Sequence, residues 1–147
     1  RVNESAVRIA RDSVFNATAV VRRVTGEDLG NYDVHVNIVG GGRIDGPSAG
    51  LAITAAIIST IQKKPIRQDL AVTGEISIQG KVKPVGGIPE KIYGAKQAGM
   101  KKVIIPYDNQ KDVPYGLKGI EVVAVKTIQE ALTHIITEEV KQNIKVG

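Results

Sequence analysis

Residues 40–62 have the sequence GGGRIDGPSAGLAITAAIISTIQ, a glycine-rich segment that runs directly into an apolar one. Pro47 suits the first turn of a helix, because its missing N–H would have no helical partner there. The residues that follow are apolar on nearly every side, which is typical of a helix buried in the middle of a domain. The stretch therefore predicts a glycine-rich loop over 40–46 and a buried helix from Pro47 to about Gln62.

Helices and strands are expected to alternate along the rest of the chain. Apolar residues spaced by three and four predict helices, whereas strict alternation or a short apolar run between turn residues predicts strands. The expected helices cover residues 4–24, 47–62, 88–98 and 127–136, with one helical turn at 109–112, and the expected strands cover 33–39, 70–77, 81–85, 103–105 and 120–125. A capping box of Thr127 and Glu130 opens the last helix, and Gly99 closes the one before it. This order predicts an α/β fold with mixed β-sheets packed with helices.

The composition excludes several classes of function. The 147 residues are 42% hydrophobic, which suffices for the core of one domain. Without cysteine there is no disulfide, thiolate zinc site or cysteine nucleophile, and a cytoplasmic location is favoured. The two histidines, His35 and His134, are too few for a three-histidine metal site, and we expect ordinary structural roles for both. The low aromatic content and the spread of basic residues along the chain argue against nucleic-acid binding. The apolar run at 51–61 is too short to span a membrane.

Ser48 falls in the first turn of the central helix, where free N–H groups stabilise negative charge. Gly46 and Gly50 on either side leave room for another backbone to approach its hydroxyl. Three interpretations fit: a polar residue near a helix cap, a loop that cradles a phosphate, or a nucleophile beside an oxyanion site. The segment is not a Walker loop, because no lysine follows Gly46, and Pro47 does not suit the strained turn of a G-x-S-x-G elbow.

Lys91 is a residue that could activate such a serine. The helix that carries it has an apolar stripe formed by Ile88, Ile92, Ala95, Ala98 and Gly99. Lys91 lies within this stripe, so it either extends its amine to the surface or becomes neutral and takes a proton from a serine hydroxyl. Thr73 is either a β-branched strand residue before a bulge at Gly74 or a hydroxyl that orients the lysine amine.

Several linked motifs, in one order, resemble the proteolytic domain of the Lon proteases in its bacterial form. The segment DGPSAG at 45–50 is similar to the family's nucleophile motif. The segments similar to its lysine region and to the continuation are TGEI at 73–76, GKV at 80–82, PVGG at 84–87, EK at 90–91, AG at 98–99, KVIIP at 102–106 and Asn109. The separation of Ser48 and Lys91 also matches the family, and the resemblance covers essentially the whole chain.

The resemblance implies a Lon proteolytic-domain architecture, ribosomal protein S5 domain 2-like, and serine endopeptidase activity through a Ser-Lys dyad. Ser48 would be the nucleophile and Lys91 its general base, with Thr73 positioning the lysine amine. Asp45 would be an acidic residue that pairs with the lysine and biases the site between active and inactive forms. The backbone around the serine would supply the oxyanion site, at Gly46, Pro47 and Ala49.

The resemblance also implies that residues 1–147 are the proteolytic domain of an ATP-dependent protease, without the strands that usually precede it and without the AAA+ ATPase domain. No metal or cofactor is expected in this chain, because ATP and Mg²⁺ would bind to the ATPase domain. The expected partners are unfolded or regulatory protein substrates and further copies in a hexameric ring, with no membrane or nucleic acid. Two alternatives stay open, a phosphate- or nucleotide-binding module of related fold and a non-catalytic module for ring assembly.

Overall fold

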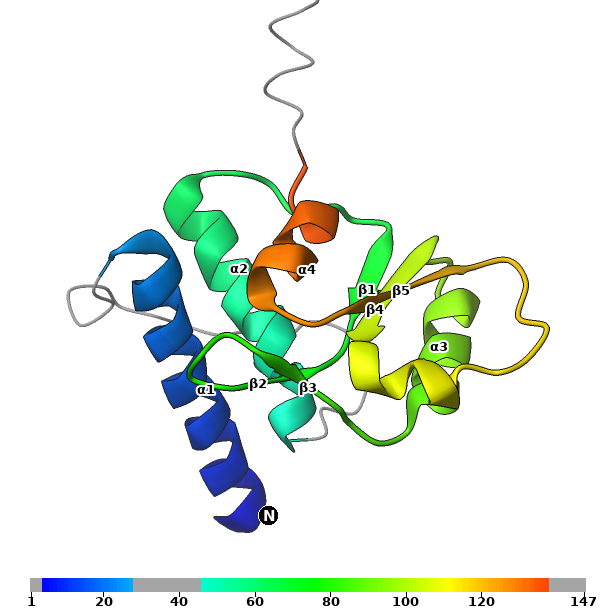
Figure 1. Ribbon diagram of the computed structural model, residues 1–147, viewed down its shortest axis with the longest axis horizontal. Helices are drawn as coiled ribbons and strands as arrows, with labels where there is room; N and C mark the ends of the chain where they lie inside the picture. The colour runs from blue at the N-terminus through cyan, green and yellow to red at the C-terminus, as the bar shows by residue number, and fades with distance from the viewer. Residues whose placement is uncertain (1–3, 28–45, 138–147) are drawn as a thin grey trace, which may run out of the picture.

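A computed structural model describes residues 4–27 and 46–137 of the chain. The strand expected at 33–39, and the loop before Gly46, lie outside these residues. The described elements are α1 (Glu4–Thr25), η2 (Gly46–Ala49), α2 (Gly50–Gln62), β1 (Leu70–Val72), β2 (Glu75–Ile76), β3 (Val82–Lys83), α3 (Ile88–Gln97), β4 (Lys102–Pro106), η3 (Tyr107–Asp112), β5 (Glu121–Val125) and α4 (Ile128–Ile135) (Figure 1). The prediction of a mixed α/β fold is confirmed.

A three-stranded parallel sheet in the order β1-β4-β5 forms the centre of the described fold. Successive side chains of β4 alternate between its two faces. Ile104 packs into a cluster with residues of α1, α2 and α4, whereas Val103 and Ile105 pack with Ile88 and Ile92 of α3. The sheet therefore separates two apolar layers, and Figure 1 shows α2 and α3 on its opposite sides. Both faces of β4 are buried, which explains why its sequence is a continuous apolar run.

The strand expected over 70–77 is divided in the structure, so that prediction is wrong. β1 ends at Val72, and β2 pairs with β3 in a separate two-stranded antiparallel sheet. Gly74 lies at the crossing, where an added Cβ would lie 3.0 Å from Val82 Cγ1 and 3.2 Å from Leu51 Cδ2. The glycine is thus no bulge within one strand; its lack of a side chain lets the backbone pass close to two packed side chains while it changes sheets.

The central helix ends at Gln62 as predicted, but its beginning and its surroundings differ from the prediction. Its first turn is the separate 3₁₀ segment η2, and the α-helical part begins at Gly50. Leu51, Ala55 and Ile58 are buried, whereas Ala56 is exposed. The helix therefore keeps one side in contact with solvent, because α1, β2 and α4 cover only the remaining sides.

The helices α3 and α4 begin where the sequence predicts them, but the strand expected over 81–85 is wrong in length. Strand β3 covers only Val82–Lys83, and the backbone of Val85 bonds to the Asn109 side chain instead of to a strand. Gly87 precedes α3 with a left-handed φ of 70°, and Thr127 Oγ1 accepts a hydrogen bond from the Glu130 N–H at 3.2 Å, as the capping box predicts. Ile88, Ile92 and Ala95 are buried as expected, but Ala98 and Gly99 are exposed. The predicted apolar stripe was therefore too long, because α3 ends at Gln97 and the chain turns away there.

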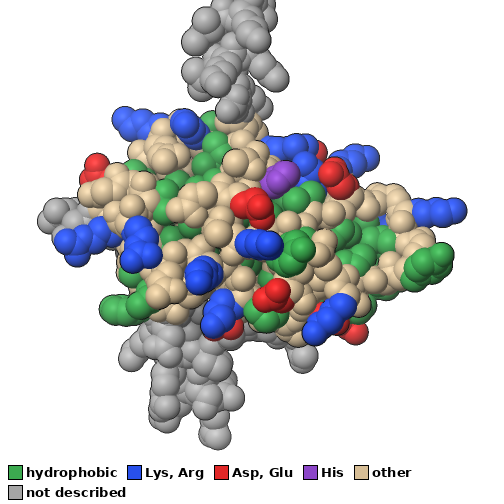
Figure 2. All heavy atoms as spheres, in the orientation of Figure 1, with side chains coloured by type: hydrophobic (Ala, Val, Ile, Leu, Met, Phe, Trp, Pro, Cys, Tyr) green, Lys and Arg blue, Asp and Glu red, His purple; other side chains and the backbone are tan. Residues whose placement is uncertain are grey.

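Charged side chains of both signs are interspersed over the face of the molecule in Figure 2. Within residues 4–27 and 46–137, no helix combines the length and the apolar character needed to cross a bilayer.

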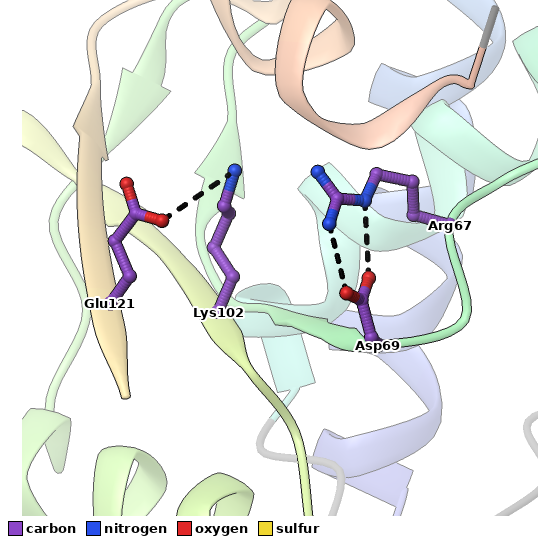
Figure 3. A network of polar contacts seen from close by, with 4 residues as sticks. All are labelled: Arg67, Asp69, Lys102 and Glu121. Atoms are coloured by element: carbon purple, nitrogen blue, oxygen red, sulfur yellow. Dashed lines mark hydrogen bonds and ion pairs between the residues drawn. The ribbon is translucent and has the colours of Figure 1, made fainter. Parts of the chain in front are cut away.

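An ion pair lies at the start of the parallel sheet (Figure 3). The Arg67 guanidinium donates to Asp69 Oδ1 at 3.1 Å and to Oδ2 at 2.8 Å, while the Asp69 carbonyl accepts the N–H of Lys101 at 2.7 Å. These side-chain hydrogen bonds lower the pKa of the Asp69 carboxyl. Lys102 and Glu121 form a looser pair across β4 and β5, with Nζ 3.8 Å from Oε1.

We expect the Arg67–Asp69 pair to stabilise the fold in a pH-dependent way. Because the Asp69 pKa is lowered on folding, the contribution is present above the ordinary aspartate pKa of about 3.9 and is lost as the pH falls through the lower folded value. Asp69→Asn should therefore lower the melting temperature slightly at pH 7, and the difference from wild type should shrink as the pH falls below the ordinary aspartate pKa. Glu121→Gln, which removes the looser pair, serves as the control, and a pH-independent Asp69→Asn effect would contradict the assignment.

Candidate active site

Ser48 lies in η2, directly before α2, and only 9% of its surface is exposed. Its carbonyl accepts the N–H of Gly74 at 3.0 Å, and the Leu51 N–H donates to the Gly74 carbonyl at 3.0 Å. Two backbone hydrogen bonds therefore fasten the serine segment to the crossing between β1 and β2. A serine held in this way has a fixed backbone, which is what a nucleophile requires.

Gly50 serves the packing of the domain. A Cβ at this position would lie 3.1 Å from Ile76 Cγ2 and 3.2 Å from the Ile76 backbone nitrogen. The space that we expected to admit another backbone is thus already filled by β2 on the Gly50 side. Gly50 lets the start of α2 approach β2 closely, and this approach places Ser48.

Thr73 is buried, with 7% of its surface exposed, next to the residue that binds the serine segment. Its N–H donates to the carbonyl of Ile104 in β4 at 3.0 Å. The structure therefore brings Thr73 and Ser48 together through Gly74 and connects both to the central strand.

Lys91 is half-buried near the beginning of α3. Its N–H donates to the Gly87 carbonyl at 3.0 Å, and its Cε would lie 3.9 Å from a Cβ placed on Gly87. The side chain thus passes back along the helix toward the Gly86-Gly87 turn. Lys91 thus lies on α3, whereas Ser48 lies in η2 and Thr73 lies between β1 and β2.

The remaining predicted residues are only partly described. Asp45 and His35 lie outside the described residues, and Gly46 and Pro47 belong to the backbone of η2. Ala49 precedes α2 in a helical conformation, with φ −83° and ψ −7°. His134 is half-buried on α4. Within the two described ranges, no three His, Cys, Asp or Glu side chains are grouped so that they could hold a metal ion.

Asn109 is a polar residue whose contacts the sequence did not predict. It is buried in η3, with 3% of its surface exposed, and it bonds to the backbone of Val85, in the segment that leads to Lys91. In the sequence, Asn109 is an amide residue at the start of a short helical turn that follows a buried strand. This pattern predicts the turn but not the bond to Val85.

Comparison with known proteins identifies the chain first as a proteolytic domain. Residues 2–138 match the family model described as the Lon protease (S16) C-terminal proteolytic domain. The chain therefore belongs to the Lon proteolytic-domain family, and the resemblance found in the sequence is confirmed at this level.

Its relatives come from both bacteria and archaea. It is 52% identical over 128 residues to Lon protease 2 of Bacillus subtilis (strain 168), covering 87% of this chain and 23% of that protein. It is 44% identical over 139 residues to the Archaeal Lon protease of Archaeoglobus fulgidus, and the match covers 92% of this chain and 22% of that protein. It is 44% identical over 135 residues to the Lon protease of Trichlorobacter lovleyi, and the match covers 84% of this chain and 16% of that protein. The chain thus spans about a fifth of the length of the curated relatives it matches.

The Gly74 crossing makes a prediction about stability. Gly74→Ala should lower the free energy of unfolding by about 1–3 kcal/mol, because the new methyl group overlaps Val82 and Leu51. Gly94→Ala is the matched control, since an added Cβ in the exposed α3 position meets nothing within 4 Å. That control should raise stability by up to about 1 kcal/mol. Urea-induced unfolding measures both changes, and equal effects would contradict the packing account.

Proposed function

We propose that this domain hydrolyses peptide bonds with Ser48 as the nucleophile and Lys91 as the general base. The neutral amine takes the proton of the Ser48 hydroxyl while the oxygen attacks the peptide carbonyl. The proton then passes to the leaving amine, which leaves an acyl-enzyme on Ser48. A water molecule then gives a proton to the Lys91 amine and attacks the ester carbonyl. As the bond between the acyl carbon and Ser48 Oγ breaks, the Lys91 amine returns that proton to Oγ, and the carboxylic acid leaves.

The observation that carries the proposal is the fixed position of Ser48. Its segment is held by backbone hydrogen bonds to Gly74, beside the buried Thr73, in a member of a proteolytic-domain family. Amide groups near the serine would stabilise the oxyanion. Of the three predicted positions, Gly46 and Ala49 have an N–H to donate and Pro47 has none. Asp45 would pair with Lys91 and restrain the amine in an inactive form.

The function of the whole protein is also our proposal. We infer an ATP-dependent protease of the cytoplasm, in which this chain is the proteolytic domain and cleaves unfolded or regulatory proteins. An AAA+ ATPase domain would bind ATP and Mg²⁺ and deliver the substrate, and six copies would enclose a chamber. The nucleophile segment over 45–50 supports the bacterial form of the site, although the relatives include archaeal proteins.

Cleavage of an unstructured peptide by the whole protein tests the proposed pair. Ser48→Ala and Lys91→Ala should each lower kcat by at least about 10³-fold, because nucleophile and base act as one unit. The double variant should lose no more than either single variant.

Two control variants match these substitutions in residue type. Ser59→Ala changes a second buried serine, which lies in α2 and bonds to the Lys64 carbonyl, and Lys96→Ala changes an exposed lysine of α3. Both controls should keep wild-type kcat. Unchanged turnover in Ser48→Ala or Lys91→Ala would refute the dyad.

Thr73 tests the positioning of the base. Thr73→Val keeps the buried volume but removes the hydroxyl, so kcat should fall about 10- to 100-fold while KM stays constant. Thr73→Ser keeps the hydroxyl and should restore most of the loss. If Thr73→Val and Thr73→Ser have equal kcat values, Thr73 acts only through packing.

A further inference from the structure

The side chain of Asn109 forms three hydrogen bonds in a buried position. Its Oδ1 accepts the Val85 N–H at 2.9 Å, and its Nδ2 donates to the Val85 carbonyl at 2.9 Å. The same Nδ2 donates to Asp112 Oδ2 at 2.8 Å. A side-chain amide has the donor and the acceptor of a peptide group, so Asn109 binds Val85 as a neighbouring strand would. It does so just after β3 has ended, where none of the described strands pairs with Val85.

The two acceptors that face Nδ2 specify the residue type at this position. The Val85 carbonyl and the Asp112 carboxylate both need a donor, and an asparagine amide supplies two N–H groups on one nitrogen. An aspartate in its place would set an anionic oxygen against both. Asn109 is therefore fitted to hold Val85 more specifically than a merely polar residue would be.

Val85 transmits this constraint to Lys91 by two routes. Along the chain, the Gly86-Gly87 turn follows, and the Gly87 carbonyl accepts the Lys91 N–H at 3.0 Å. Through space, the Val85 side chain packs in the cluster that contains Ile88 and Ile92 of the same helix. A displacement of Val85 would thus move the beginning of α3.

Asn109 is also tied to the serine side of the site through β4. It lies in η3, which follows β4 without interruption, and Ile104 in that strand accepts the Thr73 N–H. Thr73 precedes Gly74, which binds the Ser48 carbonyl. Asn109 therefore joins the segment that carries the lysine to the strand on which the serine side rests.

We propose that Asn109 is a positioning residue that fixes the place of the Lys91 side chain relative to Ser48. This inference rests on the proposed Ser-Lys function and adds a residue that acts on the base without touching the substrate. Loss of the amide would let the Gly86-Gly87 turn shift, which would misplace the amine.

The test is the rate at which a small fluorophosphonate labels Ser48 in the whole protein, followed by mass spectrometry. This rate reports activation of the serine without the requirements of peptide binding. Asn109→Ala should lower the labelling rate and the kcat for peptide about tenfold, with KM unchanged. In a Lys91→Ala background, Asn109→Ala should have no further effect, because a residue that acts through the lysine has nothing left to position.

A complementary pair of variants tests the hydrogen-bond pattern. The labelling rate of Asn109→Asp should be at least as low as that of Asn109→Ala. Adding Asp112→Asn should recover part of the rate, because the new amide can donate to the carboxylate at position 109. Asn16→Ala is the control, since Asn16 donates to a backbone carbonyl, that of Ile76, at the longer distance of 3.4 Å. It should keep the wild-type labelling rate.

Each outcome supports or overturns the inference. Equal losses from Asn109→Ala in the wild-type and Lys91→Ala backgrounds would show a general structural role, and wild-type rates in Asn109→Ala would show no role; either result overturns it. Wild-type labelling of Lys91→Ala, or no labelling of Ser48 in the unaltered protein, would refute the proposed dyad itself. The two failures are thereby distinguishable.

Discussion

Strand β4 has to be paired on both edges and covered on both faces, and the described part of the domain is arranged around that requirement. Val103, Ile104 and Ile105 are at most 1% exposed, and β1 and β5 bind the strand on either side. Burial of each such side chain contributes about 1.5–3 kcal/mol, provided that helices cover both faces. This requirement explains why α2 and α3 lie on opposite sides of one sheet. Helix α2 directly follows the proposed nucleophile, and α3 carries the proposed base.

The site inherits its geometry from that strand. On one side, β4 binds Thr73, and Gly74 next to it binds the Ser48 segment; on the other, η3 continues β4 and its Asn109 holds Val85 ahead of α3. The first route consists of backbone hydrogen bonds, and the second of two hydrogen bonds between the Asn109 side chain and the Val85 backbone. In this chain without cysteine, packing and hydrogen bonds hold the segments that carry the proposed nucleophile and the proposed base.

Sequence patterns predicted the features that have local causes. Thr127 and Glu130 marked the start of α4, and Gly99, with a left-handed φ of 84°, marked the end of α3, because caps and left-handed residues depend on immediate neighbours. The division of the strand at Gly74 was missed, since its cause is contact with Leu51 and Val82, which are distant in sequence. Motif order identified Ser48, Thr73 and Lys91 as candidates. The role of Asn109 was hidden because its bonding partner is 24 residues away and offers only backbone atoms.

A crystal structure of the whole protein with a peptidyl boronate bound would test the central claim most directly. The account predicts a covalent bond from Ser48 Oγ to boron, with the Lys91 amine within about 2.6–3.2 Å of that oxygen. It also predicts that Asn109 remains bonded to Val85 in the inhibited enzyme. A boronate attached to another residue, or a Lys91 amine directed away from Ser48 in the inhibited enzyme, would contradict the account.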